Sequence, residues 1–152
     1  MPDFSARPYP TALVTTPLGE VEVVAYDLDH FSLRASRERP FALHGVPYSG
    51  SVSFTRDPGC EWRTKEAYLS RTDCHRDVTY QQVQRVVARL LPFARTWAAT
   101  AGAMLNDADR VSIEREIERK ESEASELEGK AAAVRLELAA LRLRLAQAQR
   151  AA

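Results

Sequence analysis

Residues 113–148, IEREIERKESEASELEGKAAAVRLELAALRLRLAQA, determine most of the architecture of this chain. Apolar side chains recur in them at alternating steps of four and three residues over five heptads, a pattern typical of a coiled coil. The helix that carries them is predicted to run from residue 107 to about residue 150, roughly 66 Å, which is too long for burial inside a 152-residue protein. We therefore predict that this helix pairs with another one. The residues predicted to mediate oligomerisation are Ile113, Ile117, Leu127, Val134, Leu138, Leu141 and Leu145.

The charges along this helix are polarised. Residues 107–128 carry nine acidic and four basic side chains, a net charge of −5, whereas residues 129–150 carry five basic and one acidic side chain, a net charge of +4. A parallel in-register homodimer would place Glu116 beside Glu121 of the second chain, and such like-charge pairs in flanking positions disfavour that register. The order of acidic before basic side chains also suits the helix macrodipole, which explains the order without any partner.

An antiparallel homodimer centred near Gly129 uses the same charges favourably. It would place Glu114 near Arg142 and Glu121 near Arg135 of the second chain. Because each exposed ion pair contributes only about 0.5 kcal/mol, such pairs set the direction of pairing more than its affinity. A third arrangement is an intrachain αα-hairpin, in which the basic helix before residue 106 folds back on the acidic residues that follow it.

A shorter amphipathic helix is predicted within residues 77–106. Thr79 is its expected N-cap, and Pro92 lies inside it, so we expect a kink near residues 89–92. Asn106 and Asp107 are predicted to end this helix and to cap the long one. The apolar stripe expected to be buried consists of Val83, Val87, Leu90, Ala94, Trp97, Ala101 and Met104.

Residues 1–76 show the period-two alternation of β-strands instead. In residues 30–36 the apolar side chains at positions 31, 33 and 35 share one face, and polar side chains at positions 32, 34 and 36 share the other. Turn signals at Thr16–Gly19, Asp27–Asp29 and Pro47–Gly50 separate the predicted strands. A sheet this small needs a helix or a partner over its open face. The predicted strands are Ala12–Thr16, Glu20–Tyr26, His30–Ser36, Phe41–Val46 and Ser51–Thr55, while Trp62 and Ala67–Ser70 fit a strand or a short helix equally well.

The sequence as a whole predicts an α+β protein. It comprises an antiparallel β-meander domain over residues 1–76, a kinked helix over residues 77–106 and a long coiled-coil helix over residues 107–152. The 21 basic and 21 acidic residues cancel, which excludes a bulk polycation for nucleic acid. No apolar run reaches the roughly 18 residues that span a bilayer, and residues 1–10 lack the core of a signal peptide. We therefore expect a cytoplasmic protein without a membrane partner.

Candidates for metal or redox chemistry are few. Cys60, Cys74 and His75, with the distant His44, are possible zinc ligands, but the close cysteine pair that usually nucleates a zinc site is missing. Reduced thiols without a disulfide are the favoured interpretation, because the chain is expected in a reducing compartment. The sequence also contains no Gly-rich phosphate loop, no nucleophile elbow and no zincin motif. We therefore predict a non-catalytic protein without a cofactor.

Nucleic-acid binding is the alternative function. Arginines in the β domain alternate with tyrosines and a tryptophan, which together are the material of a base-stacking surface. Residues 1–77 nevertheless carry nine basic and eleven acidic side chains, whereas a groove that follows a phosphate backbone needs a concentrated positive field. The arginines that would form this surface are Arg34, Arg37, Arg39, Arg56 and Arg63.

The segment Ser70-Arg71-Thr72-Asp73, followed by Arg76-Asp77-Val78-Thr79, an Ala/Arg-rich helix and a coiled-coil tail, resembles small uncharacterised proteins of high-GC actinobacterial phages. The resemblance covers residues 70–150. It implies an accessory or anti-defence role exerted through protein contacts and brings no catalytic residues with it. Together with the heptads, it leads us to expect an oligomeric interaction module whose β domain contacts a macromolecular partner, most simply a host protein.

Overall fold

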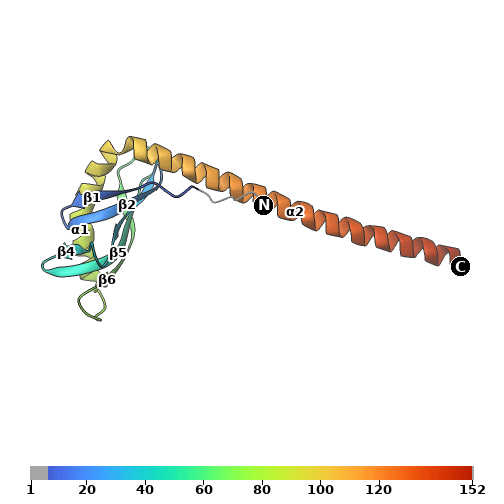
Figure 1. The fold of residues 1–152 in the computed structure, drawn as a ribbon, viewed down its shortest axis with the longest axis horizontal. Coiled ribbons are helices and arrows are strands. Elements are labelled where there is room, and N and C mark those ends of the chain that lie inside the picture. Colours follow the sequence, from blue (N-terminus) through green and yellow to red (C-terminus); the bar gives the residue numbers. More distant parts are fainter. Residues whose placement is uncertain (1–6, 152) are drawn as a thin grey trace. The chain divides into compact units, whose positions relative to one another are not determined.

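The computed structural model describes residues 7–151, which form two compact units joined within one helix. The first unit extends through Ile113 and the second begins at Glu114. The N-terminal residues 1–6, part of the segment expected to lack a signal peptide, lie outside the described residues. The elements, drawn in Figure 1, are β1 (Thr11–Thr16), β2 (Gly19–Asp27), β3 (His30–Ala35), β4 (Phe41–Leu43), β5 (Val46–Thr55), β6 (Arg63–Arg71), α1 (Tyr80–Thr100) and α2 (Gly102–Ala151).

The predicted α+β class is confirmed, because the six strands form one antiparallel sheet that precedes both helices. The sheet order is β1-β2-β3-β5-β4, with β6 pairing β5. β5 pairs with β6 along one edge and with β3 and β4 in succession along the other, so the meander is interrupted once. The predicted turns at Thr16–Gly19 and Asp27–Asp29 are present, and the ambiguous residues 67–70 belong to strand β6.

The turn predicted at Pro47–Gly50 is wrong, because these residues lie inside β5. The chain reverses earlier, at His44 and Gly45, whose φ angles of 52° and 75° give the left-handed two-residue turn that matches the twist of a hairpin. The strand predicted over Phe41–Val46 therefore ends at Leu43. Gly50 serves a different purpose from a turn, because its φ is 124° and a Cβ there would overlap the carbonyl of Tyr68 on β6.

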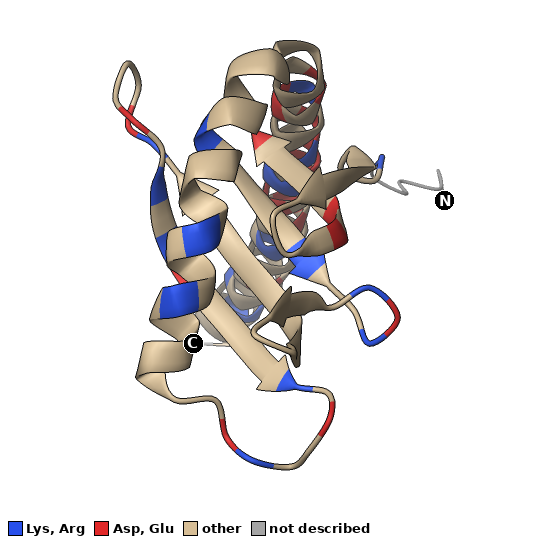
Figure 2. Cartoon of the chain, turned by 90° about the vertical axis from the view of Figure 1, so that its left-hand side faces the viewer, with Lys and Arg blue, Asp and Glu red and all other residues tan. Residues whose placement is uncertain are grey.

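Helix α1 lies across one face of the sheet, as Figure 2 shows. Thr79 caps it in a capping box with Gln82, as the sequence predicts, and Pro92 lies within it. The predicted stripe is displaced from the true centre of the buried face, since Val83, Val87 and Trp97 are only partly buried. The line of helix residues buried most completely is Val86, Leu90, Ala94 and Ala98.

An aromatic cluster joins helix α1 to the core, and the first turns of α2 are buried in the same core. The ring of Phe31 lies 4.8 Å from that of Trp62 and 4.7 Å from that of Trp97, centroid to centroid. Leu105 and Ala108, in the first turns of α2, are buried in the same core. At a spacing of three residues, Leu105 and Ala108 lie on the same face of a continuous helix. The helix break predicted at Asn106 is therefore wrong, because α2 continues through it.

That correction moves the boundary between the helices. Ala101 is the only residue between them, and α2 runs without interruption through Asn106 and Asp107. Asp107 pairs with Arg7 at 3.2 Å instead of capping a helix. The αα-hairpin considered above consequently has no turn at the residue where we expected it.

The second face of the sheet is more polar. Ser32 was expected among the polar residues of this face, yet it is buried and its hydroxyl lies 2.9 Å from that of Ser53 on the neighbouring strand. The two hydroxyls satisfy each other across the register Ser32↔Ser53. Each of these two buried side chains therefore has a hydrogen-bond partner, with one hydroxyl donating to the other.

Candidate interaction surface on the C-terminal helix

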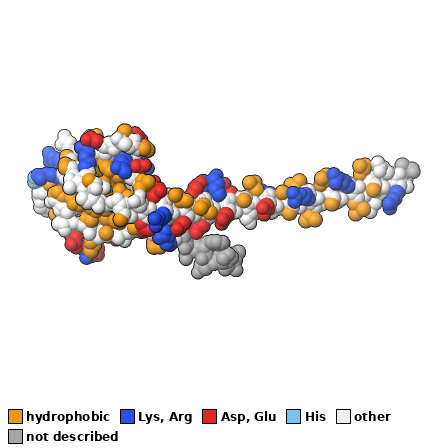
Figure 3. All heavy atoms as spheres, turned by 90° about the horizontal axis from the view of Figure 1, so that it is seen from above, with side chains coloured by type: hydrophobic (Ala, Val, Ile, Leu, Met, Phe, Trp, Pro, Cys, Tyr) orange, Lys and Arg blue, Asp and Glu red, His pale blue; other side chains and the backbone are white. Residues whose placement is uncertain are grey.

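The part of α2 beyond the globular unit presents a line of apolar side chains to solvent. All seven residues predicted to mediate oligomerisation lie on α2 and are exposed, from 43% for Leu138 to 65% for Leu127. Figure 3 shows hydrophobic side chains recurring between acidic ones in the first half of this segment and between basic ones in the second half. Scattered apolar residues on a surface need no explanation, but a line that repeats every 3.5 residues is the signature of a helix-pairing surface.

Two further leucines are exposed away from this line. Leu136 is 74% exposed and Leu143 is 61% exposed, and both occupy the heptad position opposite the seam. Alanines surround them on the same side of the helix, at positions 132, 133, 139 and 140. The C-terminal half of α2 therefore has a second, weaker apolar edge, as the sequence indicates.

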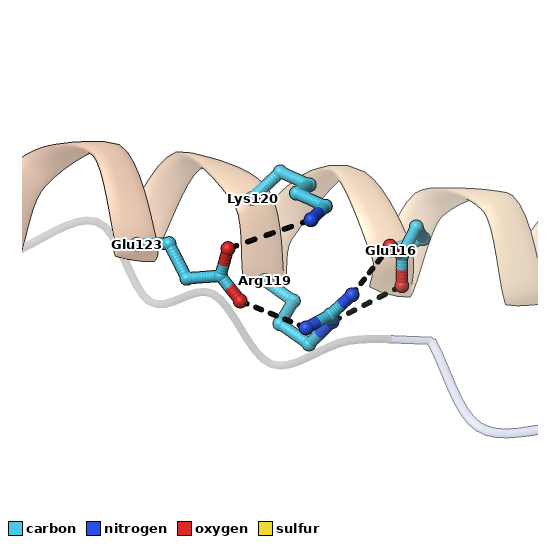
Figure 4. A network of polar contacts seen from close by, with 4 residues as sticks. All are labelled: Glu116, Arg119, Lys120 and Glu123. Carbon is cyan, nitrogen blue, oxygen red and sulfur yellow. Dashed lines mark hydrogen bonds and ion pairs between the residues drawn. The ribbon is translucent and has the colours of Figure 1, made fainter.

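A network of ion pairs occupies the acidic half of the helix (Figure 4). Arg119 contacts Glu116 at 2.6 Å and Glu123 at 2.8 Å, and Lys120 lies 3.5 Å from Glu123. The hydrogen bond from Arg119 lowers the pKa of Glu116 below its usual value. These pairs at i,i+3 and i,i+4 stabilise the helix locally and neutralise part of its negative charge.

The basic half of the helix lacks such partners. Lys130 pairs with Glu126 at 2.9 Å, but within residues 7–151 the ion pairs found on α2 include none made by Arg135, Arg142 or Arg144. These three guanidinium groups are exposed next to the apolar line. The segment thus combines unburied apolar side chains with uncompensated charge, which is the composition expected of a surface that binds another helix.

The candidate metal ligands do not form a cluster. Cys60 is exposed and Cys74 is half-buried, and both thiols are free. His75 and Cys74 line a shallow depression before α1, where Arg71 holds Asp73 at 2.8 Å and lowers the pKa of that carboxyl. In the described part of the chain no three His, Cys, Asp or Glu side chains converge as a metal site would require.

The arginines of the nucleic-acid hypothesis do not gather on one surface. Arg34, Arg37 and Arg39 lie at or beyond the C-terminal end of β3. Arg56 and Arg63 lie at its other end, because Thr55 is paired with both His30 and Arg63. Their separation removes the continuous positive groove that phosphate contacts need.

Most of these arginines are also engaged within the protein. Arg39 pairs with Glu20 at 2.7 Å, and Arg34 donates to the Tyr26 hydroxyl at 3.0 Å. Arg56 pairs with Asp29 at 2.9 Å and stacks on the Trp62 ring, whose centroid is 4.7 Å away. Arg63 lies 3.8 Å from Asp57, the longest of these ion pairs. Sequence spacing gave no signal for these pairings, because the partners come from different strands and loops.

No protein family, curated protein or solved structure matches this chain, so its own surfaces carry the functional argument. Neither of the helices described in residues 7–151 combines the length and the apolar character needed to cross a membrane.

Proposed function

We propose that this protein is a non-catalytic, oligomeric protein-interaction module that self-associates through residues 113–148. The observation that carries the proposal is the exposure of all seven predicted seam residues on one uninterrupted helix. A stripe with a 3.5-residue repeat drifts by about 20° per heptad around a straight helix, or roughly 100° over five heptads. Two such helices stay in contact only by winding around each other, so a left-handed supercoil is the expected form of the assembly.

The burial energy of the seam is comparable with the free-energy cost of association. Fully burying a leucine-sized side chain contributes about 1.5–3 kcal/mol, so burying the exposed half of one contributes about 1 kcal/mol. Fourteen such side chains in a dimer contribute roughly 14 kcal/mol, against an association cost of about 4–15 kcal/mol. The balance therefore ranges from about zero to about −10 kcal/mol, and pairing in the micromolar range requires an association cost below about 6 kcal/mol, with the ion pairs adding direction.

The globular unit is then free to contact a second macromolecule. The resemblance of residues 70–150 to phage proteins suggests an accessory or anti-defence factor that binds a host protein. The dispersed and already paired arginines of the β domain favour a protein partner over nucleic acid.

Light scattering coupled to gel filtration tests the proposal on the full chain. A protomer of 17.0 kDa should elute as an assembly of at least twice that mass at tens of micromolar protein. A monomer under these conditions would contradict self-association. Adding random-sequence DNA at low salt and at high salt in parallel distinguishes nucleic-acid binding, which weakens steeply with salt.

A further inference from the structure

Resting on the proposed function, we infer that the partner of α2 is a second copy of this chain, paired antiparallel in a register centred on residue 129. In this register facing seam residues have numbers that sum to 258, so Ile113 lies opposite Leu145 and Ile117 lies opposite Leu141 of the second copy. Two independent features of the exposed helix favour this arrangement over the parallel one, and a third limits its cost.

The first feature is the size of the side chains in each layer of the seam. A parallel dimer would stack Ala124 on Ala124 and Ala131 on Ala131, leaving two layers underfilled, and would place Lys120 against its own copy. The antiparallel register places Ala124 opposite Val134 and Ala131 opposite Leu127, so that each alanine meets a larger side chain. Because small residues then face large ones, the layers fill more evenly than in the parallel dimer, and Lys120 faces Leu138 and not its own copy.

The second feature is the charge beside the seam. The antiparallel register brings Glu121 to Arg135 and Glu116 to Arg144 of the second copy, and each contact occurs twice in the dimer. Arg135 and Arg144 take part in none of the ion pairs of α2 in the described chain, so Glu121–Arg135 needs no existing pair to break, whereas Arg144 would share Glu116 with Arg119. A parallel dimer would set Glu116 against Glu121 and leave these arginines without acidic partners.

The third feature concerns the like charges that the antiparallel register does bring together. Glu123 would face Glu137 of the second copy, but Glu123 is already held by Arg119 and Lys120. Lys130 would face itself near the centre, and its ammonium is already paired with Glu126 at 2.9 Å. Within residues 7–151, Glu128 would meet its own copy without an ion pair on its own helix, and Glu137 would meet Glu123 without one, so uncompensated repulsion is confined to these contacts.

Distances between spin labels on the two copies measure the direction and the register in which their α2 helices pair. In a dimer with Cys60→Ser and Cys74→Ser, we would label single cysteines introduced as Gln147→Cys and, separately, as Gly129→Cys, where a Cβ meets no neighbour within 4 Å. At 1.5 Å per residue the antiparallel register separates the two residues 147 by 36 rises, about 54 Å, along the dimer axis. The two residues 129 lie at the same level on the outer sides of the two helices, with their backbones under about 20 Å apart. A short distance at both positions means a parallel dimer and overturns the inference while preserving the proposed function. An antiparallel pair shifted by one heptad changes the 147 distance by about 10 Å and overturns the register.

A charge exchange provides a second, independent test. Glu121→Arg should raise the dimer dissociation constant roughly ten- to thirty-fold, because two attractive contacts become repulsive. The combined variant Glu121→Arg with Arg135→Glu should recover the original affinity. In a parallel dimer the single variant would instead tighten association, because it relieves the contact with Glu116. A monomer in the unmodified protein would refute the proposed function itself.

Discussion

Replacing Leu141 by glutamate is the sharpest test of the seam. Leu141 is 56% exposed on the isolated helix, and pairing would bury the rest of it against a second chain. Each lost leucine removes about 1–1.5 kcal/mol of burial, and a dimer loses two. Each new carboxylate must also leave water for an apolar seam without a counter-charge, at a cost of at least about 1–3 kcal/mol.

The sum is about 4–9 kcal/mol, so the dissociation constant should rise by at least a thousand-fold, and the variant should be a monomer at tens of micromolar. Sedimentation equilibrium over a concentration series measures this change. Circular dichroism in the near ultraviolet should remain unchanged, because Leu141 lies outside the globular unit and the aromatic cluster stays intact.

Leu136→Glu is the matched control. Leu136 is more exposed than Leu141, at 74%, and lies five residues away in the same helix, but on the side opposite the seam. It should leave the dissociation constant within about tenfold of the unmodified protein. If Leu136→Glu produced a monomer and Leu141→Glu did not, the assignment of the seam would be refuted.

Three further predictions concern the globular unit. Gly50→Ala should lower the free energy of unfolding by at least about 3 kcal/mol and Tm by about 10 °C, because Gly50 has a φ of 124° and a Cβ there would overlap Tyr68. Calorimetry measures both quantities. An unchanged Tm would refute the close approach of β6 to Gly50. Replacing Cys60 and Cys74 together by serine should change the free energy of unfolding by less than about 1 kcal/mol, since one thiol is exposed and both are free; release of a metal ion or collapse of the fold would assign them a structural role. Burial and, to a lesser extent, the charge of Lys65 lower the pKa of His30 below the 6.5 of the unfolded chain. Because the unfolded state then binds the proton more readily, the free energy of unfolding should fall as the pH drops below 6.5. In His30→Gln the free energy of unfolding, measured with urea, should depend less on pH over that range. An identical pH dependence in both proteins would refute the contribution of His30.

The periodic elements could be predicted because their signals are local. Alternation in residues 30–36 placed Phe31 and Leu33 in the core, and the hydroxyl of Thr79 marked the start of α1. The heptads likewise predicted a long helix, because an apolar repeat close to the 3.6 residues of a helical turn can be recognised in the sequence without any tertiary partner. The candidate interaction surface was predictable for the same reason, since it consists of the residues that this repeat leaves on one side.

Other features depended on residues far away in the sequence. Pro47 and Gly50 resemble a turn, yet they lie in a strand because His44 and Gly45 reverse the chain first and β6 pairs along β5. Asn106 resembles a helix break, but the burial of Leu105 and Ala108 in the hydrophobic core outweighs its modest helix penalty.

The arginines show the same division between local signals and tertiary contacts. Arg56 and Asp29 are 27 residues apart and meet only because strands β3 and β5 are neighbours in the sheet. Sequence by itself determined which residues are charged, which are apolar and with what period, because these are properties of short segments. Tertiary structure alone decided which carboxylate each arginine reaches and which turn signal is used, because those choices depend on the packing of strands and helices that are distant in the chain.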